Sequence, residues 1–174
     1  CEHFGCEQTT LANAVKIYEG VARRFSLIKT RQNIQVVDDF AHNPAKIAAV
    51  VRTAQGLSNR IITVYQPHGF GPTRFLKDEY IATFLTVFRS NDSLYLLPIY
   101  YAGGTVQKDI SSEDIIHGLG AASFHAHSVK NREELLARLQ AEVKPEDCVL
   151  IMGARDPSLP AFVKNVIELF GGAI

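Results

Sequence analysis

The chain has 174 residues, of which 47% are hydrophobic and 21% are charged, so it can bury a sizeable core and is not disordered. Its 18 lysines and arginines balance its 18 aspartates and glutamates, which excludes the general basic field of proteins that bind nucleic acid or an anionic membrane. No apolar run approaches the roughly 20 residues that span a bilayer, and the first residues lack the charged-then-apolar order of a secretory signal.

Apolar runs and stretches with helical spacing alternate along most of the sequence. In chain order, the pattern predicts a helix at 9–19, strands at 25–28 and 34–37, a helix at 44–56, a strand at 61–65, a helix at 77–88, a strand at 93–99, a short helix opening with capping residues at 111–114, a strand at 124–129, a helix at 131–142, a strand at 148–152 and a helix at 159–170.

The predicted elements indicate an α/β fold. The first two strands are expected to pair as a hairpin, because residues 29–33 between them are polar and suit a turn. The later strands are short, apolar and separated by helices, which favours a parallel sheet covered on both faces. We therefore expect a Rossmann-like three-layer sandwich with a mostly parallel sheet of about six strands, including the N-terminal hairpin strand. Residues 66–73, rich in proline and glycine, are predicted to form a loop.

Ligands of open α/β sheets bind at the carboxyl ends of the strands, so the residues just after each strand are the candidates for a site. Asp39 ends a predicted strand, where its carboxylate could accept the hydroxyls of a ribose or could cap the helix that Pro44 begins. His42 could stack on a base, move protons or fill the loop. His68 lies in the loop that follows the strand at 61–65.

Arginines stand near the other strand ends. Arg74 could bind a phosphate or a carboxylate, or could lie at an ordinary helix start. Arg155 and Asp156 follow the last strand and could face a ligand or pair with each other. Arg23 and Arg24 are expected to be exposed unless a partner covers them.

Other features of the sequence give weaker indications. Cys1, His3 and Cys6 match no closed tetrahedral metal pattern, and His125 and His127 share a strand face without acidic or sulfur neighbours, so no metal site is predicted. Three cysteines do not suggest a disulfide framework, which favours the cytoplasm. The chain lacks the glycine-rich loops that hold a triphosphate or a dinucleotide. It also begins without methionine, in a sequence typical of a helix, so we expect the natural polypeptide to be longer.

Four segments carry a resemblance to the carboxy-terminal domain of the Mur ligases: residues 20–25 (GVARRF), 37–44 (VDDFAHNP), 65–68 (YQPH) and 152–154 (MGA). The resemblance covers roughly residues 12–156. It implies that residues 1–24 hold the last helix of a preceding ATP-binding central domain, and that residues 25–174 form the domain that binds the acceptor amino acid.

The resemblance also implies a reaction. Mur ligases use ATP and magnesium to phosphorylate the carboxylate of UDP-N-acetylmuramate, and the amine of L-alanine or of a peptide then attacks the acyl phosphate. By resemblance, Arg24, Asp39 and His42 are expected to contact the nucleotide. The residues expected to face the acceptor are His68, Arg74, Arg155 and Asp156. The phosphate loop and most of the ATP and magnesium contacts are expected in the central domain, so the fragment alone is expected to be inactive.

Three loops depart from the pattern of the alanine-adding branch of this family. Q-P-H-R-[FY]-[ST]-R-T is replaced by residues 66–74 (QPHGFGPTR), A-G-E by residues 102–104 (AGG), and G-A-G-D by residues 153–156 (GARD). All three are expected to face the acceptor, which predicts an altered acceptor preference. Two alternatives stay open: a non-catalytic binding or regulatory module, and a three-domain ligase of the folate or cyanophycin type.

Overall fold

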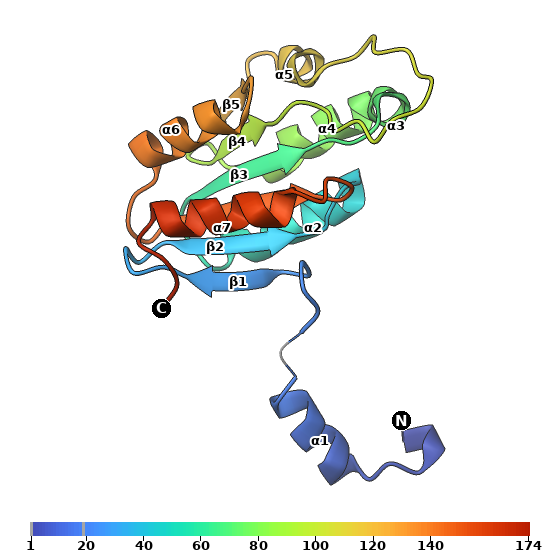
Figure 1. Ribbon diagram of the computed structural model, residues 1–174, viewed down its shortest axis with the longest axis vertical. Coiled ribbons are helices and arrows are strands. Elements are labelled where there is room, and N and C mark those ends of the chain that lie inside the picture. The colour runs from blue at the N-terminus through green and yellow to red at the C-terminus, as the bar shows by residue number, and fades with distance from the viewer. Residues whose placement is uncertain (1, 19) are drawn as a thin grey trace.

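The computed structural model describes residues 2–18 and 20–174, and its centre is a mixed sheet covered by helices on both faces (Figure 1). The described residues form six strands in the order β1-β2-β6-β3-β4-β5, and every neighbouring pair is parallel except the antiparallel hairpin of β1 and β2. This confirms the predicted fold class. The strands are β1 Ser26–Lys29, β2 Gln35–Asp39, β3 Ile61–Gln66, β4 Ser93–Leu96, β5 His125–Ser128 and β6 Cys148–Gly153.

The helices divide between the two faces of the sheet (Figure 1). On one face α2, α4 and α5 bury Val51, Phe84 and Ile115, while on the other α6 and α7 bury Leu135 and Phe162. The helices are α1 Gln8–Lys16, α2 Pro44–Gln55, α3 Phe70–Phe75, α4 Lys77–Val87, α5 Ser112–Leu119, α6 Arg132–Glu142 and α7 Leu159–Leu169, with a 3-10 turn at Glu2–Phe4.

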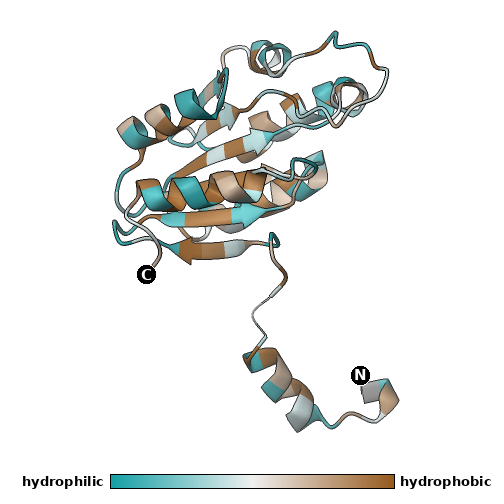
Figure 2. Ribbon diagram, in the orientation of Figure 1, coloured by the Kyte–Doolittle hydropathy of each residue, from teal (hydrophilic) through white to brown (hydrophobic). Residues whose placement is uncertain are grey.

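The two central strands, β3 and β6, are buried along their whole length, and Figure 2 shows the sheet to be largely apolar. Successive side chains point to opposite faces, so Val149 and Ile151 join one core while Leu150 and Met152 join the other. Burial of apolar surface on both faces provides the main driving force for this fold. It also explains why these strands have no alternation of polar and apolar residues.

Polar side chains fix where three helices begin. The side chain of Asn43 accepts a hydrogen bond from the backbone of Lys46 at the start of α2, and Asn131 does the same for α6. Ser111 and Asp114 form a reciprocal capping box at the start of α5, as the sequence predicts. These caps fix the backbone conformation where α2, α5 and α6 begin.

The predicted loop at 66–73 is wrong in part, because α3 begins at Phe70. Gly69 has a φ of 71°, a value that turns the chain sharply and that glycine adopts without a steric penalty. Pro72 then lies in the first turn of the helix, where its missing N–H costs nothing. The strand predicted at 93–99 ends instead at Leu96, shortly before Pro98, which has no N–H to donate to the sheet.

Helix α1 stands apart from the sheet and its covering helices (Figure 1), and it contains no buried residue. The segment around it exposes large apolar side chains, among them Phe4, Val15, Ile17 and Tyr18. Within the described residues, no helix is long and apolar enough to cross a bilayer.

Candidate functional site

The carboxyl ends of β2, β3 and β6 lie at one edge of the sheet, since the three strands are adjacent and parallel. This edge brings together Asp39 from β2, His68 from the connection after β3, and Arg155 from the loop after β6. The rings of His42 and His68 lie 5.5 Å apart, centroid to centroid. Residues that are far apart in the sequence thus form one candidate site.

The carboxylate of Asp39 is buried and connects two backbone segments. One oxygen accepts a hydrogen bond from the N–H of Phe25 and the other from the N–H of Ala41, both at 2.7 Å. The cap of α2 is Asn43, so the alternative that Asp39 caps this helix is wrong. Asn43 immediately precedes the helix and its side chain reaches the third helical N–H, a distance that Asp39, four residues earlier, does not span.

The two arginines before β1 have different environments. Arg23 is not exposed as predicted: its guanidinium contacts the carboxylate of Asp38 at 3.3 Å and the carbonyl of Gly153 at 2.5 Å. Arg24 is exposed, as predicted. Both guanidinium groups lie over the ring of Phe40. Burial raises the pKa of Asp38, although the charge of Arg23 opposes this effect.

The two histidines of the site have different hydrogen-bond states. Nδ1 of His42 lies 2.9 Å from the carbonyl of Phe40 and donates to it, because a carbonyl only accepts. Nδ1 of His68 is buried and has no hydrogen-bond partner among the described residues. Desolvation lowers the pKa of His68, and the electrostatic influence of the neighbouring His42 and Arg155 lowers it further. His68 is therefore neutral at pH 7.

Two tyrosines to which the sequence analysis assigns no role, Tyr65 and Tyr80, support the His42 loop. The hydroxyls of Tyr80 and Tyr65 donate to the carbonyl of His42, at 2.8 and 3.3 Å. Burial raises the pKa of both tyrosines, so both remain protonated donors. Their signal in the sequence is a tyrosine within an otherwise apolar core, where the hydroxyl needs a buried partner.

The remaining predicted residues, Arg74, Arg155 and Asp156, do not pair with one another. Asp156 pairs with Arg132 at 2.7 Å, so the predicted alternative of an Arg155–Asp156 pair is wrong. Arg155 is exposed. Although burial acts to raise the pKa of Asp156, the hydrogen bonds from Ser158 and the charge of Arg132 hold it below its usual value. Arg74 lies on α3 and pairs with Asp109, away from the cavity that His68 and Arg155 line.

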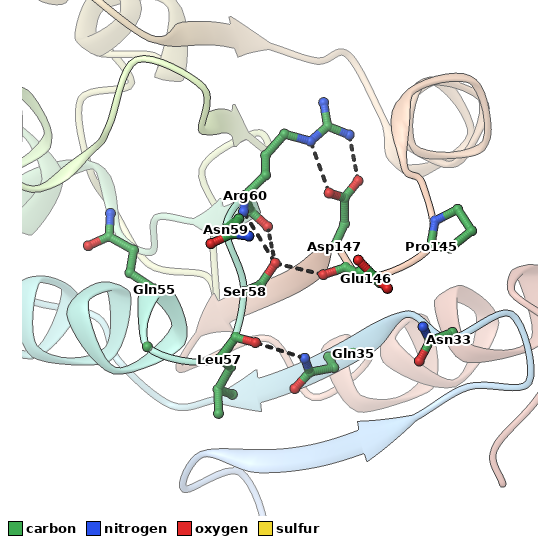
Figure 3. Close-up of a pocket in the computed structure, with 11 residues that line it drawn as sticks. Asn33, Gln35, Gln55, Leu57, Ser58, Asn59, Arg60, Pro145, Glu146 and Asp147 are labelled. Carbon is green, nitrogen blue, oxygen red and sulfur yellow. Dashed lines mark hydrogen bonds and ion pairs between the residues drawn. The ribbon is translucent and has the colours of Figure 1, made fainter.

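That cavity has a volume of about 220 Å³ and lies between the start of α3 and the segment after β4. A larger cavity, about 550 Å³, lies at the opposite edge of the sheet (Figure 3). There the guanidinium of Arg60 points toward the carboxylate of Asp147 and makes two hydrogen bonds with it, 3.0 and 2.5 Å long. None of the predicted site residues lines the larger cavity.

Among residues 2–18 and 20–174, no group of three or more histidine, cysteine or acidic side chains is placed to hold a metal ion. Cys1, which the sequence reading considered with His3 and Cys6, lies outside the described residues. His125 and His127 are exposed on β5, and the ring of His127 stacks on Tyr95 at 5.7 Å.

Comparison with known proteins shows that the chain is similar to Mur ligases. The family model described as "Mur ligase, glutamate ligase domain" matches residues 23–155. The UDP-N-acetylmuramate--L-alanine ligase of Cereibacter sphaeroides is 31% identical over 154 residues, which are 87% of this chain and 32% of that protein. The enzyme of the same name from Acetivibrio thermocellus is 32% identical over 157 residues, 90% of this chain and 33% of that protein. The chain thus spans about a third of the length of these curated relatives.

Solved structures show the same fold. The UDP-N-acetylmuramate-alanine ligase of Thermotoga maritima superposes with a TM-score of 0.71 and 22% identity, over 96% of this chain and 34% of that one. A murein peptide ligase from Psychrobacter arcticus superposes with a TM-score of 0.66 and 16% identity, over 99% of this chain and 35% of that one.

Proposed function

The chain belongs to the Mur ligase family, and from this premise we propose that it is the acceptor-binding carboxy-terminal domain of an ATP-dependent ligase that joins an amino acid or a peptide to UDP-N-acetylmuramate. Ligases of this name are its relatives, at 31–33% identity. The observation that carries the proposal is the gathering of Asp39, His42, His68 and Arg155 at the carboxyl-end edge of the sheet, where ligands of such folds bind.

The proposed reaction forms an amide in two steps. The substrate carboxylate attacks the γ-phosphorus of ATP, which releases ADP and forms an acyl phosphate. The amine of the acceptor then attacks the acyl carbon, and inorganic phosphate leaves as the amine loses its proton. Such a reaction depends mainly on positioning the reactants and on excluding water from the acyl phosphate. We propose that this domain closes over the site and positions the acceptor.

On the nucleotide side we propose contacts from Arg24, Asp39 and His42. Arg24 is exposed and close to the ring of Phe40, so its guanidinium is available to a phosphate or a base. Each carboxylate oxygen of Asp39 accepts one backbone hydrogen bond and has capacity for another, which suits the hydroxyls of a ribose. His42 donates through Nδ1, which leaves Nε2 for a ligand.

On the acceptor side we propose His68, Arg155, Asp156 and Arg74. A neutral His68 can accept a hydrogen bond from the amine of the acceptor, and the guanidinium of Arg155 can bind its carboxylate. Asp156 would act through Arg132, which it holds at 2.7 Å. Arg74 would act from outside the 220 Å³ cavity, beside its partner Asp109.

We further propose that residues 1–24 belong to the preceding central domain and that residues 25–174 form the carboxy-terminal domain. The exposed apolar side chains around α1, such as Val15 and Ile17, support this division because they need a covering partner. ATP and Mg²⁺ would be bound mainly by the central domain, and the isolated fragment would be inactive. We place the enzyme in the cytoplasm, where ATP and UDP-linked substrates are available.

The proposal is tested by phosphate release from the full-length polypeptide, supplied with ATP, magnesium, UDP-N-acetylmuramate and a panel of amino acids and peptides. We expect release that depends on one class of acceptor and that is lost in Asp39→Ala. A folded full-length polypeptide that releases no phosphate with any acceptor would contradict the proposal and would favour a regulatory module. Release with a folate or polypeptide substrate instead would favour the other three-domain ligases.

A further inference from the structure

The 220 Å³ cavity beside His68 is apolar, unlike the rest of the candidate site. The side chains of Phe70 and Pro72 line it from α3, and those of Tyr101 and Val106 line it from the segment after β4. Its volume is several times the roughly 30 Å³ that one water occupies and lies below the roughly 300 Å³ at which sites for drug-sized ligands begin. The cavity is thus large enough for one amino-acid side chain and too small for a drug-sized ligand.

Backbone hydrogen bonds fix the two sides of this cavity relative to each other. The N–H of Gly69 donates to the carbonyl of Tyr100, and the N–H of Tyr100 donates to the carbonyl of Pro67, both at 2.8 Å. The rings of Phe70 and Tyr101 also contact each other, one from each side, with centroids 5.6 Å apart and planes tilted by 59°. Because these contacts are made within the chain itself, the cavity exists before any ligand binds.

The charges around the cavity are arranged asymmetrically. Among the described residues that line it, Arg155 is the one arginine or lysine, and its guanidinium makes no ion pair with a described residue. The ammonium of Lys108 lies over the rings of Phe70 and Tyr101, at 5.9 and 4.7 Å from their centroids. The neighbouring carboxylate of Asp156 is already paired with Arg132, and Arg74 is paired with Asp109. An anion at the mouth of the cavity would therefore meet Arg155 without competition from a protein carboxylate.

Two glycines, Gly69 and Gly71, line the cavity beside the side chains of Phe70 and Pro72. At Gly69 a Cβ would lie 3.2 Å from the ring of Pro72, and the φ of 71° disfavours any other residue. Gly71 also lines the cavity, and a Cβ there would have no heavy atom within 4 Å, so the position has room for a side chain. Gly71 therefore offers a substitution that changes the cavity without straining the backbone.

We propose that this cavity binds the side chain of the acceptor, that the acceptor is an amino acid with a large apolar side chain, and that Arg155 binds its carboxylate. This inference rests on the proposed ligase function. Each methylene buried in an apolar site strengthens binding about fourfold. Alanine would leave most of the apolar wall without a partner, whereas leucine or phenylalanine would cover it. A basic side chain would lose its hydration there and would meet the positive charges of Arg155 and Lys108.

The experiment compares acceptors with the full-length polypeptide, supplied with ATP, magnesium and UDP-N-acetylmuramate, by phosphate release. We expect kcat/KM for leucine or phenylalanine to exceed that for alanine at least tenfold, mainly through KM. Gly71→Leu should raise KM for phenylalanine more than tenfold and change KM for alanine much less. Gly71→Ser is the matched control, because its short side chain leaves the cavity nearly unchanged.

A second comparison tests Arg155. Arg155→Ala should raise KM for leucine at least tenfold, leave KM for ATP unchanged, and have little effect on leucinamide, which lacks the carboxylate. Preference for alanine or for an acidic amino acid, or an equal effect of Gly71→Leu on every acceptor, would overturn this inference and leave the ligase function standing. Absence of phosphate release with every acceptor would overturn both.

Discussion

The carboxylate of Asp39 accepts a hydrogen bond from the backbone N–H of Phe25 at 2.7 Å, and so ties the end of β2 to the segment that enters β1. Phe25 has a φ of 53°, in the left-handed region that costs a non-glycine residue about 1 kcal/mol or more. The hydrogen bond stabilises this conformation. A residue proposed to bind the nucleotide thus also shapes the junction between the proposed domains.

Asp39→Asn is expected to destabilise the chain, because an amide offers one acceptor oxygen to two buried N–H groups and turns a donor toward the other. We expect a loss of roughly 1–3 kcal/mol in the free energy of unfolding, measured by urea denaturation of the 174-residue chain. Asp109→Asn, at an exposed position, is the control and should have little effect. An unchanged free energy for Asp39→Asn would show that the two hydrogen bonds contribute nothing.

Substitution by lysine is expected to change the stability of the chain at Arg23 but not at Arg24. Arg23→Lys removes the fork that reaches both Asp38 and the carbonyl of Gly153, so it should lower the free energy of unfolding by about 1–3 kcal/mol. Arg24→Lys should leave unfolding unchanged, since Arg24 is exposed. In the full-length polypeptide Arg24→Lys should raise KM for ATP. Destabilisation by Arg24→Lys, or none by Arg23→Lys, would reverse these assignments.

His68 is expected to set the acid limb of the pH profile. Because desolvation and the electrostatic influence of His42 and Arg155 lower its pKa, the midpoint should lie below the ordinary value of 6.5. The rate of acceptor-dependent phosphate release should fall as the pH drops through that midpoint, where His68 gains a proton and no longer accepts a hydrogen bond. His68→Asn should flatten this limb and lower the rate at neutral pH.

The same shift affects stability. The unfolded chain binds a proton at His68 more readily than the folded chain does. The free energy of unfolding should therefore decrease as the pH falls below about 6.5. The wild-type chain should therefore lose more stability between pH 7 and pH 5 than His68→Asn does. Equal losses in the two proteins would contradict the assignment of this titration to His68.

The layers of the fold were predictable because burial on both faces leaves a direct mark on the sequence. Strands β3 and β6 consist of buried residues throughout, and such runs have few alternatives to a central parallel strand. Helix α3 was not predicted from the sequence, because Gly69 and Pro72 are typical of turns. The same two residues also suit a short helix, and contacts with the rest of the domain decide between the two.

The edge that holds the site was also predictable, whereas the partners of its side chains were not. Asp156 binds Arg132, 24 residues earlier, and Arg74 binds Asp109, 35 residues later. Such pairs depend on how the loops after different strands pack, and no local pattern indicates them. The capping alternative for Asp39 was excluded by a different kind of detail, because Asn43 stands one residue before α2 and takes the capping role.

The ion pair of Arg60 and Asp147 at the opposite edge of the sheet (Figure 3) is expected to stabilise the fold without affecting catalysis. Arg60→Ala leaves the buried Asp147 carboxylate without its partner, so the free energy of unfolding should fall by about 3 kcal/mol. The double variant Arg60→Met with Asp147→Leu should recover much of this loss, because it removes the buried Asp147 charge together with its partner. Arg138→Ala, which breaks the exposed pair with Glu134 on α6, is the control and should leave stability nearly unchanged.

In the full-length polypeptide, Arg60→Ala should keep KM for every substrate at conditions where it remains folded, since none of the proposed site residues lines that cavity. A raised KM for ATP or for the acceptor would instead connect the two edges of the sheet.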